Sequence, residues 1–427
     1  MVIHMIIKSK IRVGYIGCGA RGQGILRECL SQMNDVELAV LCDLSENNLH
    51  AASAIVTQAG RPAPEMTGNW REVIENETLD AVMFMNGWEN RAAMAAASLR
   101  AGKYTAIEVG CAYDIRECWD LIDAYEETGV PLMMLENCCF GRREMMALNM
   151  VKQGLFGEIV HCDGGYMHNC RHVFTPAAPD PAVPNFRLES MERRNFHFYP
   201  THDFGPISKV LRINRGNRMM TLSSFASKAR GLRAHIDETF AADSAYAGME
   251  LACGDIIDTV ITCAGGETVH LRLDTTLPRP YYSRGFTVRG THGMCTEDRR
   301  IVYLNGMAET MTENEPEFFE QYDHPLHREY AALGERGSHG GMDWLVCRAF
   351  IEAVRRGENT PIDAYDTVAW MAIGPLSELS IAHGGAPVDV PDFTRGKWLH
   401  REPVTPGKYC LDAVCEDPDT RIFDDIG

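Results

Sequence analysis

The chain has 427 residues, 45% of them hydrophobic and 23% charged, and 41 basic side chains stand against 59 acidic ones, for a net charge of −18. This composition is typical of a soluble globular protein long enough for two domains. The acidic balance disfavours nucleic acid and anionic lipid as partners. Because no apolar run approaches about 18 residues, we also expect no membrane span.

The fifteen cysteines are scattered through core-like segments. This distribution indicates reduced thiols rather than a disulfide framework. The first ten residues lead straight into a strand and carry no cleavage-type site. We therefore predict a cytoplasmic protein.

The first predicted unit is a strand from Ile11 to Ile16, a glycine-rich turn from Gly17 to Gly22, and a helix from Gln23 to Met33. The turn has the spacing G-x-G-x-x-G, which is typical of dinucleotide binding. Gly17 lets the chain reverse, Gly19 lets the backbone approach a pyrophosphate, and Gly22 lets the helix pack closely on the strand. The helix N-terminus then faces the anion.

A second apolar strand, Val36 to Cys42, ends at Asp43, which lies 21 residues after Gly22. A carboxylate at this spacing binds the ribose hydroxyls of the cofactor. Because it would repel a 2′-phosphate, it favours NAD over NADP. A glycine turn alone is a weak signal, but the two flanking strands and Asp43 together predict dinucleotide binding.

The pattern of alternating strands and helices continues to about residue 137. Further strands are expected at 79–85, 104–109 and 131–135, and helices at 47–59, 71–76, 90–99 and 115–128. This alternation predicts an α/β Rossmann domain with a doubly wound parallel sheet over residues 1–137. Side chains that follow its strands are candidates for the cofactor site. The complete predicted cofactor set is Gly17, Gly19, Arg21, Gly22, Asp43, Asn86, Trp88 and Glu108.

The second part changes character, because strands now follow one another across Gly-rich turns. Strands are expected at 158–167, 219–227, 255–263, 267–275, 285–290 and 301–304, with helices at 143–153, 342–356 and 364–382. We predict an α+β substrate domain over residues 138–386 with a large, mostly antiparallel open sheet. Residues 387–427 are expected to form a tail that packs on the body. The proline-rich stretch 175–184 should be a surface loop, and the acidic stretch 309–320 a solvated face.

Two clusters after the predicted strands carry candidate catalytic groups. Pro200 suits the first turn of a helix, which would put Tyr199 and His202 on one face. The positive end of the helix dipole disfavours imidazolium, which suits a base; a buried histidine with an aromatic neighbour explains the pattern equally well. Glu136 could hydrogen-bond the substrate or the nicotinamide ribose, or could simply cap a helix at the strand end.

A zinc site among His161, Cys162, His168, Cys170 and His172 is disfavoured by the spacing. Neighbours on a strand point to opposite faces, and no pair has C-x-x-C or H-x-x-x-H spacing. We predict no metal. The chain also contains no G-x-S-x-G, so a serine-hydrolase elbow is unsupported.

These clusters resemble the oxidoreductase superfamily named for glucose-fructose oxidoreductase and inositol dehydrogenase (Gfo/Idh/MocA). Four ordered segments are similar to glycoside hydrolase family 109, whose known activity is NAD-dependent α-N-acetylgalactosaminidase. They are 136–142 (Glu-Asn-Cys-Cys-Phe-Gly-Arg), 199–202 (Tyr-Pro-Thr-His), 338–343 (Ser-His-Gly-Gly-Met-Asp) and 365–370 (Tyr-Asp-Thr-Val-Ala-Trp). The dehydrogenases usually carry Glu-Lys-Pro where this chain has Glu108-Val109-Gly110, and an Asp where it has Phe198. The hydrolase branch also lacks that lysine, so this departure favours it.

The resemblance implies a hydrolysis with no net redox change, outside the two-carboxylate scheme. NAD accepts a hydride from the sugar C3, the C2 proton is removed, the aglycone leaves C1, water adds, and the hydride returns. It implies roles for His202 and Tyr199 near C3 and the attacking water, for Tyr166 at the C2 proton or the leaving oxygen, and for Glu136 as a weaker candidate.

Two alternative functions stay open. The first is a sugar 3-dehydrogenase that releases NADH or a keto sugar, and the second is a non-catalytic NAD-dependent sensor. The presence of Tyr166, Tyr199 and His202 together favours catalysis. In each case we expect a small carbohydrate ligand. The resemblance to this superfamily implies a homo-oligomer that forms through the exposed face of the second sheet.

Overall fold

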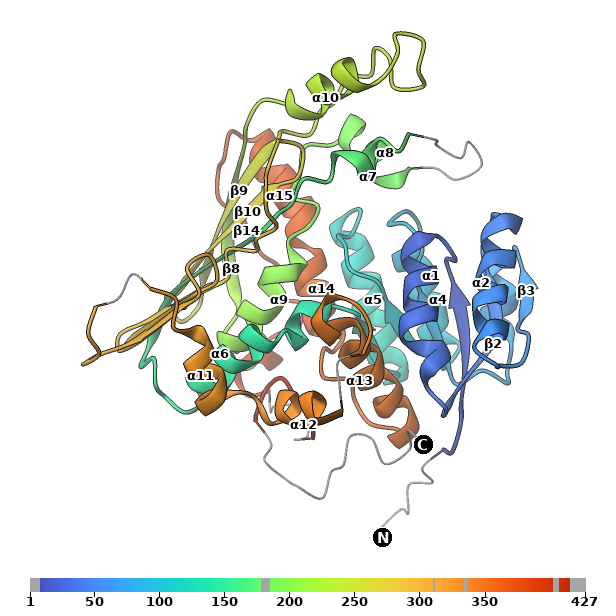
Figure 1. Ribbon diagram of the computed structural model, residues 1–427, viewed down its shortest axis with the longest axis horizontal. Coiled ribbons are helices and arrows are strands. Elements are labelled where there is room, and N and C mark those ends of the chain that lie inside the picture. The colour runs from blue at the N-terminus through green and yellow to red at the C-terminus, as the bar shows by residue number, and fades with distance from the viewer. Residues whose placement is uncertain (1–7, 178–184, 310–311, 334–335, 402–406, 415–427) are drawn as a thin grey trace.

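A computed structural model of the chain describes residues 8–177, 185–309, 312–333, 336–401 and 407–414. Its first sheet has six strands, all parallel, in the order β3-β2-β1-β4-β5-β6 (Figure 1). The strand order reverses between β1 and β4, and ligands of such sheets bind at this point, beyond the carboxyl ends of the strands. The doubly wound parallel sheet is therefore confirmed. The strands are β1 (Ile11–Ile16), β2 (Val36–Cys42), β3 (Glu65–Thr67), β4 (Ala81–Phe84), β5 (Tyr104–Ile107) and β6 (Leu132–Met134).

The helices between these strands are α1 (Ala20–Glu28), α2 (Glu46–Gln58), α3 (Trp70–Glu75), α4 (Arg91–Arg100) and α5 (Ile115–Thr128). The expected limits of the first helix, 23–33, are wrong at both ends. Helix α1 starts at Ala20, inside the glycine motif, and ends where Cys29 leaves helical geometry before a short 3₁₀ turn, Leu30–Gln32. Its free N-terminus consequently lies in the turn itself.

The second sheet has eight strands in the order β13-β12-β11-β7-β10-β9-β8-β14. All neighbouring strands are antiparallel except β7 and β10, so the mostly antiparallel sheet is confirmed. The short strands β12 and β14 escaped prediction, and β14 comes from the expected tail. The strands are β7 (Ile159–Met167), β8 (Met219–Ala226), β9 (Ile256–Cys263), β10 (Thr268–Asp274), β11 (Thr287–Gly290), β12 (Gly293–Thr296), β13 (Ile301–Leu304) and β14 (Val388–Asp389).

Helices of the second part join the two sheets. Helix α9 packs on β7 and α15 on β8, while α13 and α14 return to the first sheet and pack against β1 and β6 (Figure 1). One apolar core is therefore continuous across both sheets. The helices are α6 (Arg142–Lys152), α7 (Arg171–Phe174), α8 (Phe186–Arg193), α9 (Thr201–Val210), α10 (Gly231–Thr239), α11 (Glu315–Tyr322), α12 (Pro325–Leu333), α13 (Met342–Arg356), α14 (Ala364–Met371) and α15 (Ile373–Ala382).

The expected single helix over 364–382 is two helices, α14 and α15. Pro375 has no N–H to offer the carbonyl of Met371, one turn earlier. That carbonyl instead accepts a hydrogen bond from the Ala112 N–H at 3.1 Å. The break thus ties the C-terminal helices to the loop after β5.

The acidic stretch 309–320 is not simply a solvated face. Glu315 starts α11, is 2% exposed, and accepts a hydrogen bond from Arg143 Nη2 at 2.8 Å. The acidic run therefore contains a buried ion pair, which its composition alone does not reveal. Residues 310–311 of this stretch, and 178–184 of the proline-rich one, lie outside the described residues.

The described part of the tail lies against the body. Phe393 packs on Trp119 with ring centroids 4.9 Å apart, and Arg395 and Lys397 pair with carboxylates of α5. The fourteen cysteines of the described residues are free and buried, as expected for reduced thiols. In the same residues no helix has both the length and the apolar character that crossing a membrane requires.

Candidate active site

The glycine-rich turn has the geometry that dinucleotide binding needs. Gly17 has φ +99°, and a Cβ on it would lie 2.5 Å from the Asn86 nitrogen; a Cβ on Gly22 would lie 2.2 Å from the Gly17 oxygen. Both positions therefore require glycine. A Cβ on Gly19 would meet no atom within 4 Å. The second glycine thus faces open space, where a pyrophosphate could approach the backbone.

Asp43 lies beside this turn at the end of β2. Its Oδ2 accepts a hydrogen bond from the Cys18 N–H at 2.6 Å, and its Oδ1 accepts one from the Ser45 N–H at 2.8 Å. These bonds fix the carboxylate against the turn; Oδ1 also accepts from Asn48 Nδ2 at 3.4 Å, which leaves a further lone pair on Oδ2. The arrangement suits a carboxylate that accepts from ribose hydroxyls.

Arg21 belongs to the turn, but its guanidinium is already engaged. Asp343 binds it with two hydrogen bonds, of 2.7 and 2.8 Å, and Glu108 accepts a third at 3.0 Å. Asp343 is fully buried; burial acts to raise the pKa of its carboxyl, but the hydrogen bonds and charges of Arg21 and His339 lower it overall. Arg21 therefore connects the glycine-rich turn to the start of α13 through its ion pair with Asp343.

Asp343 also gathers three further donors, and sequence reasoning missed this central position. His339 belongs to the family-like segment 338–343, and the structure places its ring against Asp343, beside the dinucleotide turn. The donors are Asn137 Nδ2, Ser338 Oγ and His339 Nδ1, each 2.8 Å from the carboxylate.

Two buried oxygens near the turn lack a hydrogen-bond partner in the described structure. They are Asn86 Oδ1, beyond β4, and Glu108 Oε2, beyond β5. Buried acceptors are normally satisfied, and each unmade bond is costly. The hydroxyl and amide donors of a nicotinamide nucleoside fit these two oxygens, so the residues present suit NAD.

Trp88 follows β4, where a contact with the cofactor was predicted, but its ring lies within an aromatic cluster. It is 6% exposed and lies in an aromatic cluster with Phe186, Phe196, Phe198 and Tyr199, with ring centroids 5.1 to 6.2 Å away. Trp88 packs edge-on against the Tyr199 ring and so helps to fix the position of that ring. Its predicted contact with the cofactor stays a prediction.

Three rings from two segments contact one another, and we call them the ring stack. Tyr166 from β7 and Tyr199 are parallel-stacked at 4.7 Å, and Tyr199 and His202 at 5.7 Å; the Tyr166 and His202 centroids are 5.1 Å apart. Helix α9 begins at Thr201, after Pro200 as its N-cap. Tyr199 therefore lies just before the helix, and His202 in its first turn.

Glu136 lies beside His202 and has the capping role, one of the two that the sequence left open, while its contact with substrate or the nicotinamide ribose stays a prediction. Its Oε1 caps a short 3₁₀ helix by accepting from the Cys138 N–H at 3.1 Å, and lies 2.9 Å from His202 Nδ1. Glu136 is fully buried. Burial acts to raise the pKa of its carboxyl, but the adjacent His202 and the Cys138 N–H lower it overall, which favours the carboxylate. Nδ1 of His202 also lies 3.5 Å from Cys138 Sγ.

Two residues near the stack escaped the sequence analysis. Arg187 donates from Nε to the Tyr199 hydroxyl oxygen at 2.9 Å. Tyr282 lies edge-on to Tyr166 and His168, at 6.0 and 5.3 Å. Arg187 follows a proline-rich segment and belongs to no motif, so nothing marked it; the pair Tyr281-Tyr282 after Pro280 was a usable signal.

The histidines and cysteines first considered for zinc do not form a ligand group in the part of the chain that the structure describes. His161 Nδ1 bonds Thr268 Oγ1 at 2.7 Å, while Cys162 is buried in the core. Among the described residues, the group whose atoms could hold a metal ion is Glu136, Cys138 and His202. Sequence spacing could not reveal this group, because His202 comes from another element.

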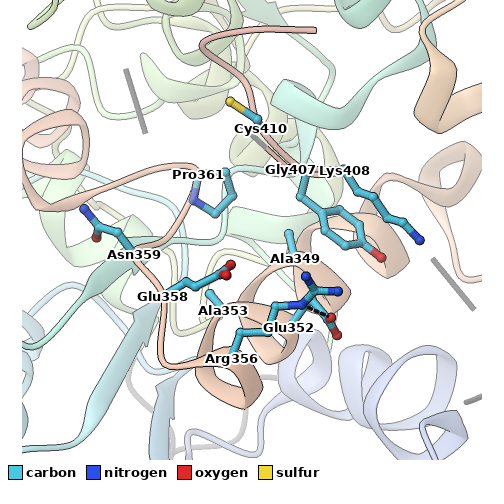
Figure 2. A pocket seen from close by; sticks show the side chains of 11 residues that line it. Ala349, Glu352, Ala353, Arg356, Glu358, Asn359, Pro361, Gly407, Lys408 and Cys410 are labelled. Carbon is cyan, nitrogen blue, oxygen red and sulfur yellow. Dashed lines mark hydrogen bonds and ion pairs between the residues drawn. The ribbon is translucent and has the colours of Figure 1, made fainter. Parts of the chain in front are cut away.

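A hollow elsewhere on the surface has no part in this site. Figure 2 shows it at the C-terminal end of α13, where Arg356 pairs with Glu352 beside Glu358 and Lys408. None of the predicted site residues is among its described lining residues. The candidate site is thus the ring stack and the adjacent dinucleotide turn.

Comparison with known proteins places the chain among its relatives. Residues 140–400 match the C-terminal domain of glycosyl hydrolase 109. The chain is 38% identical to an alpha-N-acetylgalactosaminidase of Tannerella forsythia, over 92% of this chain and 88% of that one, and 38% identical to a glycosyl hydrolase family 109 protein of Stenotrophomonas maltophilia, over 94% and 93%.

The fold has solved counterparts among dehydrogenases. A levoglucosan dehydrogenase in complex with NADH and levoglucosan superposes with a TM-score of 0.64 at 16% identity, covering 90% of this chain and 100% of that one. This likeness confirms a fold of the Gfo/Idh/MocA type. The two sequence relationships over nearly the whole length decide the closer assignment: the chain belongs to glycosyl hydrolase family 109.

Proposed function

We propose that the protein is an NAD-dependent glycosidase acting on an N-acetylgalactosaminide or a related sugar. The cycle would be oxidation at the sugar C3, elimination of the aglycone, addition of water and re-reduction. The observation that carries this proposal is the stack of Tyr166, Tyr199 and His202 over the buried Glu136 carboxylate. One family member of known name is an alpha-N-acetylgalactosaminidase, and the NADH complex of a protein of similar fold supports the cofactor.

The ring stack and the dinucleotide turn are neighbours. Asn137, next to Glu136 in the chain, donates to Asp343, and Asp343 holds Arg21 of the turn. Bound at this turn, beside Gly19, Asp43, Asn86 and Glu108, NAD would accept and return a hydride at the sugar C3. The chain's own residues then have to move protons and exclude water.

His202 is suited to act as the base for a sugar hydroxyl. The Glu136 oxygen at Nδ1 favours the tautomer with the proton on that nitrogen, so the lone pair of Nε2 can accept a proton. The Glu136 charge also stabilises the imidazolium that forms. Glu136 is accordingly a positioning residue that acts through His202.

The two tyrosines differ in their surroundings and would divide the remaining steps. Burial raises the pKa of Tyr166, so this phenol keeps its proton and can donate a hydrogen bond to the leaving oxygen. Tyr199 accepts a hydrogen bond from Arg187, whose guanidinium stabilises negative charge that develops on the phenol oxygen. Tyr199 therefore suits removal of the C2 proton.

We extend the proposal to the organisation of the protein. We assign the cofactor domain to residues 1–137, the substrate domain to 138–386 and the tail to 387–427. The exposed Phe225 and Val260 on the outer face of the second sheet support a homo-oligomer. The buried free cysteines support a cytoplasmic location, and the net charge of −18 supports a small carbohydrate rather than nucleic acid or a membrane as partner.

The test is to incubate the purified protein and NAD in D₂O with a panel of α- and β-linked nitrophenyl sugars, N-acetylgalactosaminides included. We expect release of nitrophenol, deuterium at C2 of the product and no accumulating NADH. Accumulation of NADH without release would replace the proposal by a sugar 3-dehydrogenase. Bound NAD with neither signal would leave the sensor or a sugar outside the panel.

Variants connect the activity to the stack. His202→Gln and Tyr199→Phe should each lower kcat by at least about 100-fold, since general acid–base groups contribute about 10²–10⁴-fold. His383→Gln, an exposed position at the end of α15, should leave kcat unchanged. Equal rates for His202→Gln and His383→Gln would remove His202 from the mechanism.

A further inference from the structure

Three side chains at the base of the ring stack offer three different kinds of metal ligand. Glu136 presents a carboxylate oxygen, Cys138 a thiol sulfur and His202 a ring nitrogen, and these atoms all lie within 4.8 Å of one another. The separation is 3.5 Å between Cys138 Sγ and His202 Nδ1, and 2.9 Å between Glu136 Oε1 and the same nitrogen. A set of one oxygen, one sulfur and one nitrogen is typical of zinc and not of magnesium or calcium.

The separations suit a tetrahedral ion. With Zn–S of about 2.3 Å and Zn–N of about 2.0 Å, a tetrahedral angle puts sulfur and nitrogen about 3.5 Å apart, which matches Cys138 and His202. The same arithmetic puts oxygen and nitrogen about 3.3 Å apart. Glu136 and His202 would have to separate by about 0.4 Å, as the ion replaces the proton between them.

The second oxygen of Glu136 adds an independent observation. Oε2 of this fully buried residue makes no hydrogen bond in the described structure, and the Thr201 hydroxyl, which acts to lower the pKa of the Glu136 carboxyl, also has none. An unmade bond of this kind is costly in a low-dielectric interior. A cation bound at this carboxylate would offset the cost of burying both of its oxygens.

We propose that Glu136, Cys138 and His202 form a latent inhibitory site for a soft divalent cation such as Zn²⁺. On binding, the Cys138 S–H bond breaks, its proton goes to solvent and a sulfur–zinc bond forms, with no change in oxidation state. His202 binds through Nδ1, so its proton moves to Nε2. A ring that is protonated on Nε2 and bound to metal at Nδ1 cannot accept another proton.

The inhibition rests on the proposed role of His202, but the binding does not. The site has three protein ligands, and water would complete the tetrahedron. Cys139, the next residue, provides a matched control, because its sulfur lies 3.0 Å from where a Cβ on Gly205 of α9 would be and thus packs within the core. It is not among the atoms of the candidate metal group.

The experiment titrates ZnCl₂ into the full chain against a chelating dye, and CoCl₂ into a parallel sample for thiolate-to-cobalt absorbance. The variants are Cys138→Ser and Cys139→Ser. We expect one Zn²⁺ per chain, a cobalt–thiolate band, and no displacement by a large excess of MgCl₂. Since loss of a group that merely supports a ligand costs about 10–100-fold in metal affinity, Cys138→Ser should weaken binding by at least about 100-fold. Cys139→Ser should bind as the parent does.

Zinc affinity that is equal in the two variants, or a cobalt band that survives Cys138→Ser, would overturn the site. With activity as the second measurement, ZnCl₂ should inhibit glycoside cleavage at the concentration at which it binds, and chelation should restore the rate. Binding at the site without inhibition would refute the inhibitory role while leaving the glycosidase proposal intact. Absence of any glycosidase activity would refute the proposed function and leave the binding result standing.

Discussion

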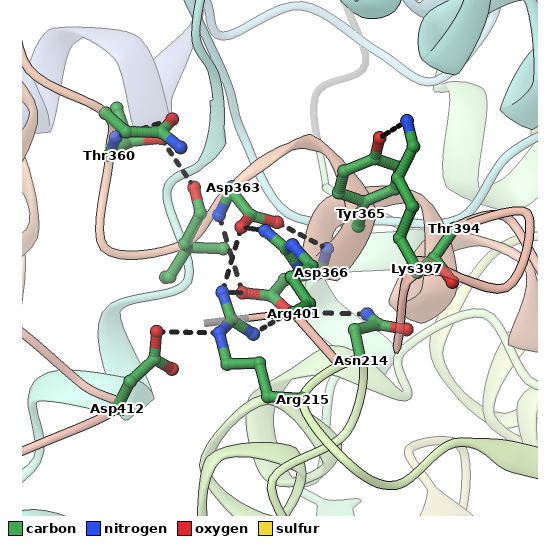
Figure 3. A network of polar contacts seen from close by, with 12 residues as sticks. Asn214, Arg215, Thr360, Asp363, Tyr365, Asp366, Thr394, Lys397, Arg401 and Asp412 are labelled. Atoms are coloured by element: carbon green, nitrogen blue, oxygen red, sulfur yellow. Dashed lines mark hydrogen bonds and ion pairs between the residues drawn. The ribbon is translucent and has the colours of Figure 1, made fainter. Parts of the chain in front are cut away.

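Replacing Asp366 with asparagine should destabilise the fold strongly, because Asp366 is the central acceptor of a buried ion-pair network (Figure 3). It is 1% exposed and accepts from Lys209 Nζ at 2.6 Å and from Arg215 Nη1 at 2.8 Å. The network balances three cations against three carboxylates, and asparagine would leave a net positive charge in the interior. Its members are Lys209, Arg215 and Arg401 with Asp363, Asp366 and Asp412.

The magnitude follows from burial. Removing one partner of a buried pair costs about 3–5 kcal/mol, whereas an exposed pair contributes about 0–1 kcal/mol. With an unfolding entropy of about 2.1 cal/mol/K per residue, the thermal midpoint of a chain of this size moves by roughly 1 °C per kcal/mol, so Asp366→Asn should lower it by about 3–5 °C. The control is Asp123→Asn, which removes the partner of Arg395 where both side chains are 46% exposed, and its midpoint should move by no more than about 1 °C.

A double variant separates charge balance from packing. Lys209→Met with Asp366→Asn removes one charge of each sign, so its loss should be smaller than the sum of the two single losses by about 1–3 kcal/mol. Differential scanning calorimetry of the four proteins gives this coupling. Strict additivity, or a loss for Asp366→Asn no larger than that for Asp123→Asn, would refute the reasoning.

Three further predictions concern pH, cofactor and turnover. Burial lowers the pKa of His197 to about 3, below its value in the unfolded chain. The free energy of unfolding should therefore have its full value above about pH 6.5 and fall by about 1.4 kcal/mol per pH unit toward pH 3. His197→Gln should remove this slope from urea midpoints measured against pH. Gly22→Ala should weaken NAD binding at least about tenfold by calorimetry, through a clash of about 1–3 kcal/mol, while Gly24→Ala, with no atom within 4 Å of the added carbon, should bind normally. Arg187→Lys keeps the charge but loses the Nε–H donated to Tyr199, and should lower kcat about tenfold or more with little change in thermal midpoint.

The local sequence determined the dinucleotide turn almost completely. Gly17 and Gly22 permit a backbone approach that any side chain would block, and that constraint acts over a few residues. The alternation of apolar strands and helices likewise fixed the parallel sheet, because βαβ units have essentially one handedness and a short loop. Pro375 could have located the break between α14 and α15, since a missing N–H is a local property.

The site needed the tertiary structure. The sequence pointed to Tyr166, Tyr199, His202 and Glu136 one by one, through position after a strand or in a motif. It could not show that Glu136 lies 2.9 Å from His202, 66 residues later in the chain.

The sequence also could not predict which charged side chains, far apart in the chain, form ion pairs. The bonds of Arg21 to Asp343 cross 322 residues, and that of Lys209 to Asp366 crosses 157. Such contacts depend on which helices pack on which sheet, and any carboxylate of similar reach would satisfy the same arginine or lysine. Local propensity fixed the elements and the glycine turn, whereas only the packing of α9 and α13 between the two sheets decided which polar side chains meet.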